Sequence, residues 1–213
     1  MLSEAALFSF IATLFSMMNP IGNIGVFAGM TADRSDADSR KIAWNCAIAV
    51  AITLLIVVWA GPRLLTLFGV TVDTLRAAGG LIVLVIGLHM LFNKSQHKHS
   101  AEELEDAQAQ ESIAVVPLAI PMVAGPGTMA AVLVAAQQES AILSKVEISL
   151  VIVGFSVLVG VLFSFASPIA NRIGESGMGV VTRVMGMILA AIAMGMLTEG
   201  LKALLPGLAG QAG

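Results

Sequence analysis

The sequence predicts an all-α, polytopic membrane protein with six transmembrane segments arranged as two inverted three-helix repeats. Three observations predict it: the composition, a set of uncharged runs, and residues of the first half that recur in the second at a nearly constant offset. Of the 213 residues, 57% are hydrophobic and only 12% are charged, whereas about 25% are charged in soluble globular domains. Such a chain is typical of proteins that live in a bilayer.

The uncharged runs give the membrane segments. Four stretches contain no Asp, Glu, Lys or Arg: residues 5–30, 42–62, 112–138 and 148–171. A helical crossing needs about 20 mostly apolar residues, so each stretch is long enough. Two shorter runs, 77–92 and 184–198, reach that length when they are extended back past Arg76 and Arg183. Six segments follow, three in each half of the chain.

Landmarks of the first three segments recur in the last three. The matching pairs, 105 to 107 residues apart, are Pro20 with Pro126, Pro62 with Pro168, Gly69 with Gly174, Arg76 with Arg183 and Gly79 with Gly186. Because each half crosses the membrane an odd number of times, the second half enters from the opposite side. We therefore predict a first repeat over 1–93 and a second over 112–213, joined by a polar linker at 94–111 into one membrane domain.

The first segment is interrupted at its centre by Asn19, Pro20, Gly22 and Asn23. Proline removes a backbone donor, and glycine allows backbone angles that other residues avoid. In hydrocarbon, irregular backbone persists only where it is buried in protein or faces a water-filled cavity. The two amide side chains can satisfy the freed backbone groups or bind a ligand. We predict that the first helix is discontinuous here.

The fourth segment is interrupted at the matching place by Gly125, Pro126, Gly127 and Thr128. Thr128 could supply a hydroxyl where Asn23 supplies an amide. Paired breaks in two repeats point to the binding site of a secondary transporter. Helix N-termini at such breaks suit a carboxylate, whereas carbonyl ends suit an ammonium group or a cation. The alternative is a pair of proline kinks that shape packing only.

Arg76 and Arg183 each precede the third segment of their half. An arginine near the end of a span usually extends its charge to the membrane surface. The alternative is that one of them enters the cavity or pairs with Asp73 or Glu175, and so gates the site. Both arginines are therefore gating or ion-pair candidates.

Several function classes are excluded by what the chain lacks. The net charge is −3 and there is no basic tail, so no nucleic-acid partner is expected. The chain has no HExxH, GxSxG or P-loop string, the cysteine is single, and no His spacing matches a zinc site. We expect no enzyme activity, cofactor or metal. A channel remains open, because broken helices also line pores.

Four strings resemble the MarC family of bacterial inner-membrane proteins, also called the small neutral amino acid transporter or SnatA family: NPIGN at 19–23, RAAGG at 76–80, VPLAIPMVAGPGT at 116–128 and TRVMG at 182–186. The resemblance implies six spans in inverted repeats, with breaks in the first and fourth helices at the residues named above. It also implies transport of small neutral amino acids such as glycine and alanine, driven by a cation gradient of Na⁺ or H⁺. An exporter of amino acids or metabolites of the LysE-like type remains an alternative.

The basic residues predict the orientation. With the N-terminus outside, seven of the 11 Lys and Arg residues fall on the cytoplasmic side and four on the other. Cytoplasmic loops carry the excess of positive charge in membrane proteins. We therefore expect both termini on the periplasmic side of the bacterial inner membrane.

Overall fold

A computed structural model describes residues 2–92, 113–138, 141–205 and 207, and the predicted linker at 94–111 lies outside them. Within this part of the chain every regular element is helical, which confirms the all-α prediction. The elements are α1 (Glu4–Met18), α2 (Asn23–Met30), α3 (Asp36–Leu67), α4 (Val72–Phe92), the π-type helix η1 (Ala114–Val123), α6 (Pro126–Gln138), α7 (Ile142–Ser164) and α8 (Ala166–Leu204).

Five helical stretches among the described residues are long and apolar enough to cross a membrane: Glu4–Met30, Asp36–Leu67, Val72–Phe92, Ile142–Ser164 and Ser176–Leu204. The predicted fourth segment, 112–138, is divided between η1 and α6 and so forms no helix of that length. The described residues thus include five helices able to span a membrane, and the arrangement of six spans as an inverted repeat stays a prediction.

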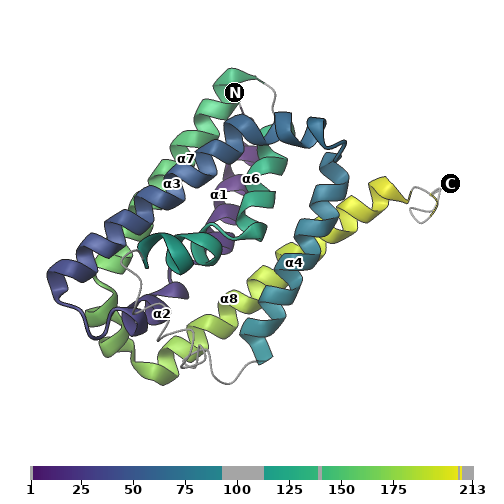
Figure 1. Cartoon of the computed structure of the whole chain (residues 1–213). Coiled ribbons are helices and arrows are strands. Elements are labelled where there is room, and N and C mark those ends of the chain that lie inside the picture. The colour runs from purple at the N-terminus through teal and green to yellow at the C-terminus, as the bar shows by residue number, and fades with distance from the viewer. Residues whose placement is uncertain (1, 93–112, 139–140, 206, 208–213) are drawn as a thin grey trace.

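Two antiparallel helix pairs enclose the broken helices (Figure 1). On one side α3 lies against α7, and on the other α4 lies against α8. Between the pairs lie α1 and α6, with α2 and η1 nearer one end of the molecule. The beginnings of α1 and α4 and the ends of α6 and α8 gather at the opposite end. We call the end of the molecule where α1 begins the N-terminal end.

Helix boundaries differ from the uncharged runs where charged residues lie beyond the apolar stretch. The long helix α3 begins six residues before the run at 42–62, where the Ser35 hydroxyl accepts a hydrogen bond from the Asp38 N–H (3.1 Å). Such N-caps begin helices because they satisfy a free backbone donor. The run at 148–171 overlaps α7, which is long and apolar enough to span a membrane, but the helix ends at Ser164, seven residues before the run does. Pro168 has no N–H to donate to the Ser164 carbonyl four residues earlier, and α8 starts here instead.

Glycines let α4 and α8 approach each other closely. A Cβ added at Gly80 would lie 2.6 Å from the Leu197 nitrogen, and one added at Gly87 would lie 2.9 Å from the Gly186 oxygen. Small residues at helix interfaces allow this approach in membranes. Since the opposing atoms belong to the backbone, α4 and α8 form one tightly packed unit.

Two glycines that the sequence pairs across the halves both have a positive φ angle. Gly69 follows α3 with φ of 67°, and Gly174 interrupts α8 with φ of 73°. Glycine adopts positive φ without the steric cost that a Cβ imposes. Each glycine comes shortly before the helical stretch that carries Arg76 or Arg183.

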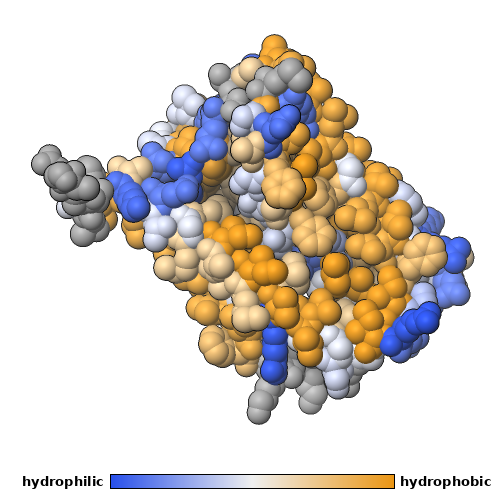
Figure 2. All heavy atoms as spheres, turned by 180° about the vertical axis from the view of Figure 1, so that it is seen from behind, coloured by the Kyte–Doolittle hydropathy of each residue, from blue (hydrophilic) through white to orange (hydrophobic). Residues whose placement is uncertain are grey.

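The outer surface is apolar over a broad band. Figure 2 shows hydrophobic residues across the middle of one face, with hydrophilic residues gathered toward its upper left and lower right edges. Large apolar side chains such as Ile52 and Ile56 on α3 and Leu150 on α7 are more than half exposed. Exposed apolar areas of this extent mark contact with lipid or another protein, and a bilayer suits a band bounded by polar ends.

Candidate functional site

The first break is built around Asn19. This residue ends α1 in the left-handed conformation (φ 45°, ψ 52°) and is 6% exposed. Its Oδ1 accepts a hydrogen bond from the Gly22 N–H (3.3 Å), and its Nδ2 lies 3.9 Å from the Met90 sulfur. Asparagine tolerates this conformation better than most residues because its short polar side chain bonds locally. A Cβ at Gly22 would lie 2.5 Å from Asn19 Oδ1, so glycine is needed beside it.

The second break begins inside η1. Val116 (φ −126°, ψ 125°) and Ile120 (φ −128°, ψ 123°) are extended rather than helical. Each directly precedes a proline, Pro117 or Pro121, and proline forces the preceding residue toward extended angles. The chain then leaves η1 at Ala124, and α6 begins at Pro126.

One hydrogen bond recurs at both breaks. The Asn23 amide nitrogen donates to the carbonyl of Met18, the last residue of α1 (3.1 Å). The Thr128 hydroxyl donates to the carbonyl of Val123, the last residue of η1 (3.0 Å). In both cases a side chain five residues later satisfies a carbonyl that the broken helix leaves without a partner. The Asn23 amide and the Thr128 hydroxyl thus cap the end of the preceding helix at both breaks.

The two breaks face one cavity of about 280 Å³, which we call the break cavity. Seven of the eight predicted break residues line it: Asn19, Gly22, Asn23, Gly125, Pro126, Gly127 and Thr128. Its remaining wall is apolar and comes from Met17, Val26, Val83, Ile86, Met90, Met122 and Leu189. Pro20 is buried and lies outside this lining. The sequence-predicted residues therefore converge on one place.

The polar groups of the break cavity carry no formal charge. None of the described residues that line it is Asp, Glu, Lys or Arg. Gly127 and Thr128 belong to the first turn of α6, so their N–H groups have no acceptor within the helix. Those N–H groups and the helix dipole favour a carboxylate. The Asn23 Oδ1 and the second lone pair of the Met18 carbonyl offer acceptors to an ammonium group.

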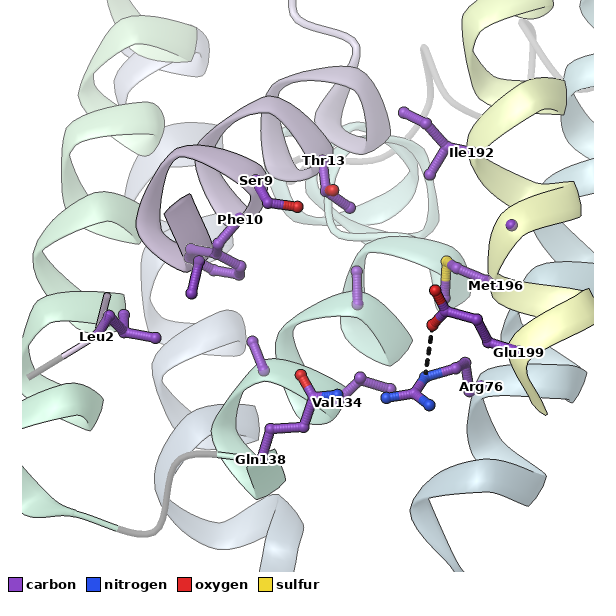
Figure 3. A pocket seen from close by; sticks show the side chains of 14 residues that line it. Leu2, Ser9, Phe10, Thr13, Arg76, Val134, Gln138, Ile192, Met196 and Glu199 are labelled. Carbon is purple, nitrogen blue, oxygen red and sulfur yellow. Dashed lines mark ion pairs between the residues drawn. The ribbon is translucent and has the colours of Figure 1, made fainter. Parts of the chain in front are cut away.

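A second cavity of about 430 Å³ lies farther along α1, α4, α6 and α8, toward the N-terminal end of the molecule. We call it the vestibule (Figure 3). Ser9 and Thr13 of α1 face it from one side, and Arg76 of α4 and Glu199 of α8 face it from the other. Gln138 reaches it from the end of α6.

A buried apolar cluster borders both cavities and consists of Met17, Val83, Met90, Ala131, Met185, Leu189 and Ala193. All of these except Met90 and Met185 lie at the level of the helices between the break cavity and the vestibule. Val83 is 1% exposed, and a Cβ added at Gly127 would overlap its Cγ2. Because Gly127 lines the break cavity and Ala131, one turn later, lines the vestibule, only about one turn of helix separates them. We call the five residues Met17, Val83, Ala131, Leu189 and Ala193 the barrier.

The two candidate arginines differ. The Arg76 side chain is 13% exposed, and its Nη1 lies 3.4 Å from Asp73 Oδ1 and its Nε 3.7 Å from Glu199 Oε2. The pairing with Asp73 is one of the two that the sequence suggested. Arg183 is exposed, lines neither cavity, and has no ion pair with any residue that the structure describes. The side chain of Glu175 lies outside the described part.

A family model for MarC integral membrane proteins matches residues 5–205. The chain belongs to the MarC family. The matched region contains both breaks, the barrier and nearly all of the vestibule. Membership agrees with the resemblance of the strings at 19–23 and 116–128.

Curated relatives of this MarC protein cover almost its full length. It is 34% identical to the UPF0056 membrane protein YhcE of Escherichia coli, over 94% of each chain. It is also 34% identical to YvbG of Bacillus subtilis, over 94% of this chain and 98% of that one. It is 32% identical to MJ1677 of Methanocaldococcus jannaschii, over 90% of this chain and 93% of that one. No solved structure matches the chain.

The vestibule of this MarC protein is not predicted by the sequence. Its polar residues Ser9, Thr13 and Gln138 belong to no motif. A signal was nevertheless present: Asp73 and Arg76 begin one helix, and Glu199 falls near the end of another. Once the two helices are placed antiparallel, these charges must meet at one end. The pairing of helices, rather than any local pattern, brings them together.

Proposed function

We propose that this MarC family protein is a secondary transporter for a small neutral amino acid, glycine or alanine in kind, which binds in the break cavity. The observation that carries the proposal is the convergence of two matched helix breaks on one uncharged polar cavity. A paired break of this type is the arrangement that secondary transporters use for binding near the bilayer midplane.

The cavity's size and wall support a small zwitterion. Its volume of about 280 Å³ lies just below the roughly 300–1,000 Å³ of pockets for drug-sized ligands. The N-terminal turn of α6 favours the carboxylate, and the acceptors at the first break favour the ammonium group. The apolar wall leaves room for a short side chain, and a charged side chain there would find no counter-ion.

The two antiparallel helix pairs and the barrier support alternating access. In this arrangement one bundle moves against the other and exposes a fixed site to each side in turn. A cation gradient, Na⁺ or H⁺, would drive the cycle in the bacterial inner membrane, with both termini periplasmic. The alternatives are a LysE-like exporter and a channel, and the barrier across the route favours a transporter over an open pore.

Uptake into proteoliposomes tests the proposal. Purified protein should take up labelled glycine or alanine with saturable kinetics, and an inward Na⁺ or proton gradient should accelerate uptake. Lysine and glutamate serve as matched charged solutes and should not enter. Absence of saturable flux from correctly folded protein under every gradient would refute transport. Unitary currents under voltage would favour a channel, and flux that runs only outward from the cytoplasmic face would favour an exporter.

A further inference from the structure

We propose that the vestibule is a second binding site for a zwitterionic amino acid, with the carboxylate at Arg76 and the ammonium group at Glu199. The choice of ligand rests on the proposed function, and the site itself rests on the geometry of the vestibule. The break cavity binds the same solute without formal charges, whereas the vestibule binds it through a fixed pair of opposite charges.

The guanidinium of Arg76 is largely withdrawn from solvent and only loosely paired. Its side chain is 13% exposed, and its two ion-pair contacts measure 3.4 and 3.7 Å, longer than the roughly 2.7–2.9 Å of strong charge-assisted hydrogen bonds. A guanidinium carries five N–H donors, so several remain for a ligand. Ionisable residues placed inside membrane proteins generally face a cavity and serve function.

The Arg76–Glu199 pair does not join parts that could separate as a gate. It links α4 to α8, and these helices are held together backbone to backbone near the pair itself. A Cβ added at Gly200, next to Glu199, would lie 2.6 Å from the Ala77 nitrogen, next to Arg76. Both charges therefore sit on one rigid wall of the vestibule.

The opposite wall is polar and uncharged. Figure 3 shows the hydroxyl groups of Ser9 and Thr13 directed from α1 toward the vestibule, and the Gln138 side chain directed from α6 toward Arg76. Hydroxyl and amide groups can donate to a carboxylate that lies against the guanidinium. A ligand held here would touch both walls.

The charges of the vestibule discriminate between classes of ligand. Arg76 and Glu199 line the vestibule, and Asp73 pairs with Arg76 from outside the lining, so the three residues carry a formal net charge of −1. A ligand with a carboxylate and no ammonium group would pair with Arg76 but would be repelled by the two carboxylates of Asp73 and Glu199. A zwitterion pairs with both signs, because the Glu199 carboxylate is 69% exposed and can accept from an ammonium group. The vestibule is thus suited to zwitterions over plain carboxylates.

Kinetics of alanine uptake test the site. Arg76→Gln and Glu199→Gln should each raise the KM for alanine by about tenfold or more, since a hydrogen bond to a charged group contributes roughly 1.5–3 kcal/mol, while kcat changes less. Arg183→Gln is the matched control, because it removes the exposed arginine at the corresponding position of the second half. Lys202→Gln removes a positive charge near the same end without lining the vestibule, and both controls should keep the wild-type KM.

Competition and direct binding complete the test. Propionate, which lacks the ammonium group, should compete with alanine poorly against the wild type and should compete better against Glu199→Gln. Calorimetric binding of alanine in nanodiscs should weaken in both vestibule variants, and Glu199→Gln changes an exposed residue that should not impair folding. An unchanged KM and unchanged alanine binding in both variants, with transport intact in the wild type, would overturn the vestibule site alone. Alanine binding that depends on Arg76 without any flux would overturn transport alone, and no alanine binding to the wild type would overturn both.

Discussion

Gly127→Ala probes the contact between the break cavity and the barrier. The added Cβ would overlap Val83 Cγ2 and would lie 3.7 Å from the Met17 sulfur. Val83 is 1% exposed and has little room to turn away. Inserting a methyl group into a packed core costs about 1–3 kcal/mol, so Gly127→Ala should destabilise the protein by that amount. Because the first turn of α6 must move, alanine uptake should fall as well.

Val83→Ala supplies the partner for a double-mutant cycle. By itself it deletes two buried methyl groups, at roughly 0.5–1.5 kcal/mol each by analogy with Ile→Val. In the double variant the added Cβ occupies the space that the valine vacates, so its cost should be close to that of Val83→Ala alone. Gly154→Ala is the matched control, because a Cβ added there meets no atom within 4 Å.

Unfolding in detergent, followed by far-UV circular dichroism, measures the cycle, and alanine uptake measures function. Uptake should be low in Gly127→Ala and should recover in the double variant. Additive costs, equal to within about 0.5 kcal/mol, would show that the two residues do not meet and would refute the described contact.

Three further substitutions address the breaks and the helix packing. Asn19→Ala should destabilise the protein by about 1–3 kcal/mol, because alanine is strained in the left-handed conformation and cannot accept the hydrogen bond from the Gly22 N–H. Asn19→Gly should destabilise it less in an unfolding measurement, because glycine is not strained in that conformation. Thr128→Ala should cost a similar 1–3 kcal/mol by leaving the buried Val123 carbonyl unpaired, and Thr128→Ser should restore both stability and uptake. Gly87→Ala should lower the unfolding midpoint by forcing α4 and α8 apart, whereas Gly195→Ala, with no atom within 4 Å of its Cβ, should leave the midpoint unchanged.

The positions of the breaks could be predicted because proline and glycine act locally. Gly22 is required beside Asn19, and α6 begins at the predicted Pro126. The extended angles before Pro117 and Pro121 lengthen the second break beyond the residues that were predicted. The end of α7 was harder to predict, because the charge-free run continues past Ser164 while the helix does not. Hydropathy reports which residues face lipid, but backbone donors decide where a helix ends.

The chemistry of the candidate site could be predicted only in part. Asn23 and Thr128 were recognised as matched polar residues, yet their bonds to Met18 and Val123 depend on how each broken helix ends. The vestibule depends on residues from four helices, and no local pattern brings these together. Arg76 and Arg183 match in the sequence, but their surroundings differ because Asp73 and Glu199 have no counterparts near Arg183 among the described residues.

The inequality of the two arginines has a kinetic consequence. If the halves exchange conformations during transport, the opening that forms on the far side lacks the charged trio found near Arg76. A solute that enters from the vestibule side would first bind at Arg76 and Glu199 before it reaches the break cavity, whereas a solute that enters from the other side would meet no such charges. Half-saturation should therefore occur at different concentrations on the two faces, with maximal velocities differing in proportion. The final distribution of solute would be unaffected, since a protein that only catalyses passage cannot alter the driving gradient.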